Sequence, residues 1–296
     1  MQDAIARFGP DQAIYESFMK ACGYSRYKDN FERIARHLPY ERAQQLAHQD
    51  PMILEAALFQ IAGLLPEQWD FPGEPPPHFL RLAELRQRHL SGLRKLNVDW
   101  PKVGVRPNNF PERRLAGAVR VIARTASPGL AGALESIWSG DGTPMERRKG
   151  FEAIFPGTLG FWPQHATWQG KAFAKPCALL GQDRVRSIIG NVFVPAALAN
   201  ARSARNRIRE ERVFGFFAAM PAESSSRIIN TMVPRLFGDI TPPRMDFRIQ
   251  QGLIQIYQDW CEPNPSCRNC PVIPYLDDIP GPPKPDTTEG DAARAE

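Results

Sequence analysis

The sequence contains no apolar run long enough to cross a bilayer. Its most apolar stretch is residues 188–199, which Asn191 and Pro195 interrupt, so this stretch is expected to belong to a protein core. The segment Met1–Pro10 lacks the basic residues and the apolar stretch of a signal peptide. These absences predict a soluble, cytoplasmic protein in a reducing compartment, where disulfide bonds are disfavoured.

The sequence motifs of several enzyme classes are also missing. We find no G-x-G-x-x-G or G-x-x-x-x-G-K-[ST] loop for nucleotides, no H-E-x-x-H motif for zinc and no G-x-S-x-G turn. No two carboxylates lie in an obviously shared turn. Enzymatic activity is therefore unsupported by motifs, although their absence does not exclude it.

Alternation of apolar and polar residues at the period of a strand is almost absent. Apolar residues instead recur at helical spacing in segments bounded by proline and glycine. The clearest segment begins with Asp50 as N-cap and Pro51 at the first helical position, and it ends at Gly63. Such segments predict an all-α fold, a multi-helix orthogonal bundle of about ten helices.

Two of these helices carry polar residues or end signals of interest. The helix from Asp11 to Cys22 is expected to stop at Gly23, because a left-handed glycine commonly follows a helix. Cys22 lies on the apolar stripe of that helix and is expected in the core. The helix from Gln182 to about residue 199 carries Asn191 inside its apolar run, so Asn191 must hydrogen-bond a neighbour or face a cavity.

Proline-rich segments define the expected domain limits. Residues 1–276 are predicted to form the helical domain, with a cysteine-rich loop after its last helix. The run from Pro72 to Pro77 is too stiff for a helix and places a possible subdomain break at residues 70–77. Residues 277–296 have too little apolar surface to fold and are predicted to be a disordered tail.

Two groups of arginines are spaced so that each would share one face of a continuous helix. Rows of guanidinium groups match the phosphates of nucleic acid, and the excess of Lys and Arg (37) over Asp and Glu (32) has the same sign. Glu210 and Glu211 lie within the group formed by Arg202, Arg205, Arg209 and Arg212, so a helix stabilised by surface salt bridges is an equal alternative for this group. The predicted nucleic-acid contacts are Arg202, Arg205, Arg209, Arg212, Arg113, Arg120 and Arg124.

An aromatic loop from Phe161 to Gly170 holds a histidine between two tryptophans. Such a histidine can be a ligand, a proton donor or a packed loop residue, and the last is the commonest. Together with the turn before Pro111, this loop could line a pocket for a small anionic substrate. The candidate pocket residues are Arg106, Asn109, Trp162, His165 and Asn191.

Three of the five cysteines, Cys261, Cys267 and Cys270, lie close together after the last helix. Their C-x5-C-x2-C spacing suits a metal site, because a C-x2-C pair can chelate one ion. Three cysteines with a histidine or solvent predict zinc, with an iron–sulfur cluster or inert packing thiols as alternatives. His165 and Cys177 are the candidates for a fourth ligand.

Several short motifs occur in a characteristic order along the chain. They are Gly23-Tyr24, Asn30, Leu38-Pro39, Leu58-Phe59, Ala62-Gly63-Leu64, Arg106-Pro107, Asn109-Phe110-Pro111, Arg114, Phe161-Trp162, His165, Asn191, Pro195 and Cys261, Cys267, Cys270-Pro271. Together they resemble the helical C-terminal portion of the bacterial domain-of-unknown-function family numbered 2851, and the similarity covers about residues 7–276. The resemblance implies no activity and no catalytic residues. Longer members have a further strand-rich N-terminal part, which implies a truncated or split version here and a separate N-terminal catalytic partner.

The functional hypothesis from sequence is a helical binding module. It would hold nucleic acid through the arginine groups, with a metal or cluster bound by the cysteine loop. One alternative is an enzyme that acts on a small anionic substrate. The other is a structural domain that binds a protein partner.

Overall fold

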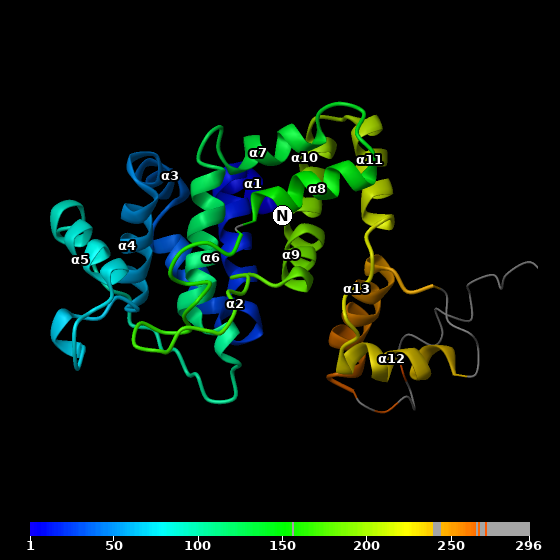
Figure 1. Ribbon diagram of the computed structural model, residues 1–296. Helices are drawn as coiled ribbons and strands as arrows, with labels where there is room; N and C mark the ends of the chain where they lie inside the picture. The colour runs from blue at the N-terminus through cyan, green and yellow to red at the C-terminus, as the bar shows by residue number, and fades with distance from the viewer. Residues whose placement is uncertain (156, 239–243, 265, 267–269, 271–296) are drawn as a thin grey trace, which may run out of the picture. The chain divides into compact units, whose positions relative to one another are not determined.

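The computed structural model describes residues 1–155, 157–238, 244–264, 266 and 270 (Figure 1). Every regular element in these residues is a helix, which confirms the all-α prediction. Contacts between Cα atoms divide the chain into two compact units, residues 1–223 and 224–296, which are described separately. None of the helices in the described ranges combines the length and apolar character needed to span a membrane. The predicted tail, residues 277–296, lies outside these ranges.

The first unit consists of α-helices joined by short turns and by longer connecting segments. Its 3-10 turns are η1 (Gln68–Asp70) and η2 (Pro107–Asn109), and η3 (Ile189–Phe193) is a π-helical turn. The proline-rich segment at residues 70–77 lies inside this unit, between η1 and α5. The helices are α1 (Gln2–Phe8), α2 (Pro10–His37), α3 (Tyr40–Gln49), α4 (Pro51–Ala62), α5 (Pro77–His89), α6 (Pro111–Arg124), α7 (Leu130–Trp138), α8 (Pro144–Ile154), α9 (Gln182–Ile188), α10 (Val194–Ser203) and α11 (Arg207–Ala218).

Helix α4 follows the predicted end signals closely. The Asp50 side chain accepts a hydrogen bond from the backbone N–H of Met52 (2.8 Å), and Pro51 occupies the first helical position. Gly63 ends the helix in the left-handed conformation (φ 64°). Local capping chemistry is therefore sufficient to define both ends of this helix.

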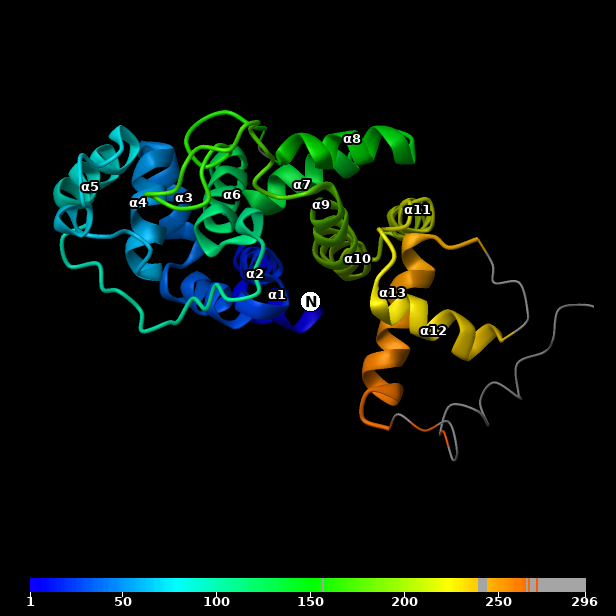
Figure 2. The same cartoon turned by 60° about the horizontal axis from the view of Figure 1, so that its bottom comes forward.

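Helix α6 is the central helix of the first unit. It packs against α2, α3 and α4, and Figures 1 and 2 show it between the α3–α5 group and the α7–α10 group. A Cβ atom at Gly117 would lie 3.1 and 3.2 Å from side-chain atoms of Leu180 and Leu179. The missing side chain lets the end of the loop at residues 157–181 pack directly on α6.

Helix α2 bends at Tyr24, which has non-helical backbone angles (φ 60°, ψ −166°). The break falls where we predicted a helix end, but Tyr24, not Gly23, has the positive φ. A Cβ atom at Gly23 would lie 2.7 Å from the backbone N and Cα of Lys28, so glycine is needed there for close approach. Cys22 is fully buried, as predicted, and burial raises the pKa of its thiol to about 12.

Asn191 follows the first of its two predicted alternatives, a hydrogen bond to a neighbour. It is exposed on η3, and its side-chain amide donates to the Ser187 hydroxyl (3.4 Å). The π turn contains one more residue than an α-helical turn. The apolar face is nevertheless continuous across it, since Ile188, Ile189, Val192 and Phe193 are all buried.

The second unit contains α12 (Arg227–Phe237), α13 (Phe247–Ile256) and the π-helical turn η4 (Tyr257–Cys261). Ile229, Met232 and Leu253 form its buried cluster, and Cys261 packs against this cluster in a partly buried position. Trp260 lies on η4 and is exposed.

Candidate functional site

Arg113 holds the loop at residues 157–181 to α6, and its side chain is completely buried (0% exposed). Burial lowers the pKa of this guanidinium group. Arg113 is therefore an internal clamp for the loop and is not available to a nucleic acid. Its two Nη atoms donate to four backbone oxygens, those of Trp162, His165 (3.1 Å), Cys177 (3.0 Å) and Ala178 (3.1 Å).

The other two arginines of the predicted α6 row also face the protein. Arg124 donates to the backbone oxygens of Ala153 (2.8 Å) and Phe155 (2.7 Å). Arg120 is half-buried beside Gly160, where a Cβ atom would lie 2.7 Å from its Nη2 atom. Helical spacing places these residues on one face, but the segment between α8 and α9 covers that face.

The predicted arginine row after α10 is interrupted, since α10 ends at Ser203 and Asn206 caps α11. Arg205 lies in the intervening turn with a positive φ of 51°. The other three form salt bridges, the alternative that the sequence left open, and nucleic-acid binding by them stays a prediction. The pairs are Arg202 with Glu210 (2.8 Å), Arg209 with Glu135 (2.7 Å) and Arg212 with Asp141.

The predicted metal ligands fall partly outside the described residues. Cys267 is outside them, whereas Cys261 and Cys270 are free and partly buried. In the part of the chain that the structure describes, no group of three His, Cys, Asp or Glu side chains could hold a metal ion. Zinc or an iron–sulfur cluster at the three cysteines stays a prediction.

Two of the predicted pocket residues lie together in the aromatic loop. Trp162 is almost fully buried (1% exposed) and stacks on Phe59, with ring centroids 5.2 Å apart. The His165 ring stacks on Phe161 at 4.2 Å, and its Nδ1 lies 3.0 Å from the backbone oxygen of Phe161. Trp162 and His165 therefore pack the loop.

The remaining predicted pocket residues lie elsewhere in the first unit. Arg106 and Asn109 are exposed on and beside η2, and Asn191 is exposed on η3. The backbone oxygen of Asn109 accepts a hydrogen bond from Nε of Arg114 (3.0 Å). This contact links the η2 turn to a second arginine of α6.

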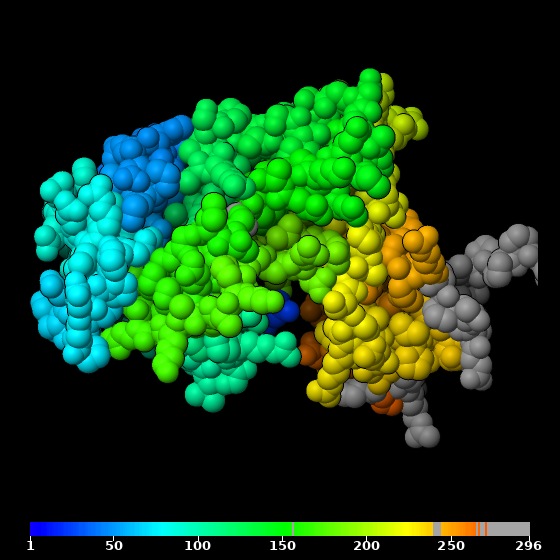
Figure 3. All heavy atoms as spheres, viewed as in Figure 1, coloured from blue at the N-terminus to red at the C-terminus, as the bar shows by residue number. Residues whose placement is uncertain are grey.

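A buried carboxylate on α4 organises the other side of the loop. Oε1 of Glu55, a residue 8% exposed, lies 2.7 Å from Nε1 of Trp162 and 2.7 Å from Nε2 of His78. The His78 ring stacks on Phe161 (5.3 Å), and Gln169 donates to the backbone oxygen of Asp70 (3.0 Å). Figure 3 shows the loop as a green band beside the cyan atoms of the segment around α5.

The strained residue Tyr24 is the centre of a cationic cluster. Its ring is 48% exposed, and the guanidinium carbons of Arg184 and Arg114 lie 3.6 and 4.8 Å from the ring centroid. Burial lowers the pKa of both arginines, and Arg184 lowers that of Arg114 further. Nε of Arg184 is buried and has no hydrogen-bond partner within the described residues. Glu223 supplies an opposite charge near Arg184.

Two exposed arginines border this cluster. Arg26 follows Tyr24 in α2, and its Nη1 lies 4.0 Å from the position of a Cβ atom on Gly104. Arg106 accepts a backbone hydrogen bond from Asn109 (2.8 Å), whose own oxygen is bound by Arg114. Arg114 itself is buried (5% exposed), and its Nη1 also donates to the backbone oxygen of Cys22 (2.9 Å). We call the surface formed by Tyr24, Arg26, Arg106 and Arg184, which lies over Arg114, the Tyr24 surface.

The backbone of Tyr24 occupies a region of φ/ψ space that is essentially restricted to glycine, at a cost of about 1–3 kcal/mol. We therefore expect Tyr24→Gly to be more stable than Tyr24→Ala by about 1–3 kcal/mol, because both lack the ring and only glycine relieves the backbone. Urea unfolding followed by circular dichroism measures the difference. Equal stability of the two variants would contradict the strain.

Sequence reasoning missed the Tyr24 surface and the Glu55 network. In the sequence, Tyr24 and Arg114 stand out only as parts of the motifs that resemble the family. The sequence did contain a signal for Tyr24. The predicted helix ends at Gly23, and the residue that follows is a tyrosine and not a second glycine. No local pattern distinguishes Arg114 from the buried Arg113 beside it.

These features define an all-helical domain with an arginine-bordered, strained tyrosine on its surface and a clamped aromatic loop. The chain belongs to the family described as "Protein of unknown function (DUF2851)", whose model matches residues 6–226. This range nearly coincides with the first compact unit, so the cysteine segment lies beyond the match. No curated protein and no solved structure matches the chain.

Proposed function

We propose that the first unit binds single-stranded nucleic acid at the Tyr24 surface. The observation that carries this proposal is Tyr24, a half-exposed residue whose backbone is strained and whose ring is held against two guanidinium groups. Strained backbone is retained where the surrounding structure requires it, and such positions are concentrated at functional sites. A positively charged surface with an exposed aromatic ring is the usual arrangement for stacking an unpaired base and contacting its phosphates.

The charge of the Tyr24 surface supports the same proposal. None of its three arginines, Arg26, Arg106 and Arg184, forms a carboxylate ion pair within 4 Å among the described residues. Arg202, Arg209 and Arg212 differ in this respect, because carboxylates already occupy them. Guanidinium groups without such partners can release counterions from phosphates when they bind.

The proposal predicts a salt dependence that maps to these residues. Anisotropy of a fluorescent oligothymidylate is measured against KCl concentration for the wild type, the single variant Arg184→Gln and the double variant Arg26→Gln/Arg106→Gln. Each lost phosphate contact is expected to reduce the log–log slope by about 0.7, so the single variant reduces it by about 0.7 and the double variant by about 1.4.

The matched control is Arg205→Gln/Arg207→Gln, which removes the same charge from the α10–α11 turn and α11. It is expected to leave the slope unchanged. Melting curves test folding, and the exposed pair Arg26 and Arg106 keeps the experiment decisive if the Arg184→Gln variant unfolds. Absence of wild-type binding, or equal slopes in site and control variants, would overturn the proposal. Tighter binding of a matched duplex would assign the surface to double-stranded nucleic acid instead.

A further inference from the structure

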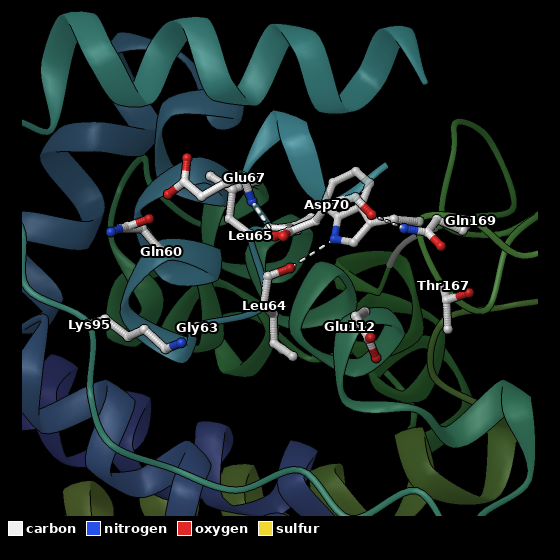
Figure 4. A pocket seen from close by; sticks show the side chains of 12 residues that line it. Gln60, Gly63, Leu64, Leu65, Glu67, Asp70, Lys95, Glu112, Thr167 and Gln169 are labelled. Atoms are coloured by element: carbon white, nitrogen blue, oxygen red, sulfur yellow. Dashed lines mark hydrogen bonds between the residues drawn. The ribbon is translucent and has the colours of Figure 1, made fainter. Parts of the chain in front are cut away.

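A cavity of about 460 Å³ lies where the end of α4, the start of α6 and the loop at residues 157–181 meet (Figure 4). Trp168 forms part of its wall and is fixed by a hydrogen bond from Nε1 to the backbone oxygen of Leu64 (2.8 Å). Neither the family match nor the Tyr24 surface accounts for this cavity. Its polar groups define what it can bind.

Glu112 contributes a carboxylate with one unpartnered oxygen. The residue is 4% exposed and lines the cavity from α6. Lys102 pairs with Oε1, but Oε2 is buried with no hydrogen-bond partner among the described residues. Burying a carboxylate oxygen without a hydrogen bond costs free energy. We therefore expect a ligand in the cavity to donate a hydrogen bond to Oε2 of Glu112.

Lys95 supplies the opposite charge from the other side. Its side chain crosses the face of Gly63, where a Cβ atom would overlap its Cε and lie 3.0 Å from Nζ. Gly63 therefore leaves room for the lysine to reach the cavity. Figure 4 shows Lys95 entering beside Gly63, whereas Glu112 enters on the side of Thr167. Within the described residues, Lys95 forms no ion pair.

The remaining polar lining consists of acceptors and neutral groups. Glu67 and Asp70 add two carboxylates, and the hydrogen bond from Arg86 lowers the pKa of Glu67. Gln60 and Gln169 add carboxamides. Arg86 already binds both oxygens of Glu67 (2.9 and 2.7 Å), so the lining offers a ligand the Lys95 ammonium group, Oε2 of Glu112 and the Asp70 carboxylate. This set matches a ligand that carries one anionic group and two ammonium groups.

We propose that this cavity binds a free basic amino acid. The ligand's carboxylate pairs with Nζ of Lys95, and its α-ammonium group donates to Oε2 of Glu112. Its side-chain cation lies beside the Asp70 carboxylate. Each of these contacts is a charge-assisted hydrogen bond. The inference is independent of nucleic-acid binding at the Tyr24 surface.

Isothermal titration calorimetry with three matched probes tests the proposal. L-Ornithine carries both ammonium groups and the carboxylate, putrescine is the same chain without the carboxylate, and 5-aminopentanoate lacks the α-ammonium group. We expect L-ornithine to bind, and each of the other two to bind about tenfold more weakly, because each loses one charge-assisted contact.

Variants assign the contacts to residues. Lys95→Met is expected to weaken L-ornithine about tenfold and leave putrescine unchanged. Glu112→Gln is expected to remove the preference for L-ornithine over 5-aminopentanoate. Lys149→Met on α8 is the control and leaves all three affinities unchanged. If Glu112→Gln fails to fold, Lys95→Met still decides, since Lys95 is exposed. No heat from millimolar L-ornithine, or equal L-ornithine affinity of Lys95→Met and the wild type, would overturn the proposal.

Discussion

Replacing Arg113 with methionine is expected to lower the free energy of unfolding by about 3–5 kcal/mol, in the range for removing one member of a buried charged network. The side chain is fully buried and serves the backbone oxygens of Trp162, His165, Cys177 and Ala178. Methionine fills much of the same volume but donates no hydrogen bond. The loop at residues 157–181 would keep its apolar contacts and lose its attachment to α6.

Urea unfolding and hydrogen exchange of the loop measure the two consequences. Arg113→Lys retains the charge but cannot reach several oxygens with one planar fork, so it is expected to be destabilised as well. The control is Arg207→Met, at an exposed arginine of α11, for which we expect a change within about 0.5 kcal/mol. A stable Arg113→Met protein with an unchanged loop would show that apolar packing alone holds the loop.

Replacing Glu55 with leucine is expected to lower the free energy of unfolding by about 3 kcal/mol. The change leaves the buried indole N–H of Trp162 without its acceptor and removes the partner of His78. It also removes the negative charge nearest Arg120, whose pKa is lowered by burial and raised by Glu55. One substitution therefore removes a hydrogen-bond partner or an opposite charge from three groups, the Trp162 indole, His78 and Arg120.

A double-mutant cycle with Trp162→Phe separates these effects. Phenylalanine lacks the indole donor, so in this background the loss of the Glu55 acceptor leaves no indole unsatisfied. The double variant is expected to be less destabilised than the sum of the single variants by about 1–2 kcal/mol. Strict additivity in urea unfolding would contradict a direct Trp162–Glu55 contribution.

Much of the helical structure could be predicted because its determinants are local. The cap at Asp50, Pro51 and Gly63 define α4, and the break after Cys22 was expected at the correct place. Capping and helical periodicity act within a few residues, so they can be read along the chain. The same spacing holds across the π turn around Asn191, where Ile188, Ile189, Val192 and Phe193 are buried and Asn191 bonds to Ser187.

The candidate site could not be predicted to the same extent, because residue spacing does not specify the partners of a charge. Arg209 pairs with Glu135, and Arg113 reaches Cys177, in both cases across more than sixty residues of sequence. Of the arginines that looked free from the sequence, Arg113 is buried and Arg202, Arg209 and Arg212 are paired, whereas Arg184 lies against Tyr24.

The sequence by itself determined that this protein is helical, where its best-capped helices begin and end, and that Cys22 is internal. Only the tertiary structure decided which guanidinium groups remain available and that Tyr24 has a strained backbone. It also decided that Lys95 and Glu112 line the same cavity. The physical reason is that helix formation depends on neighbouring residues, whereas the desolvation and pairing of a charge depend on distant segments that meet only after folding.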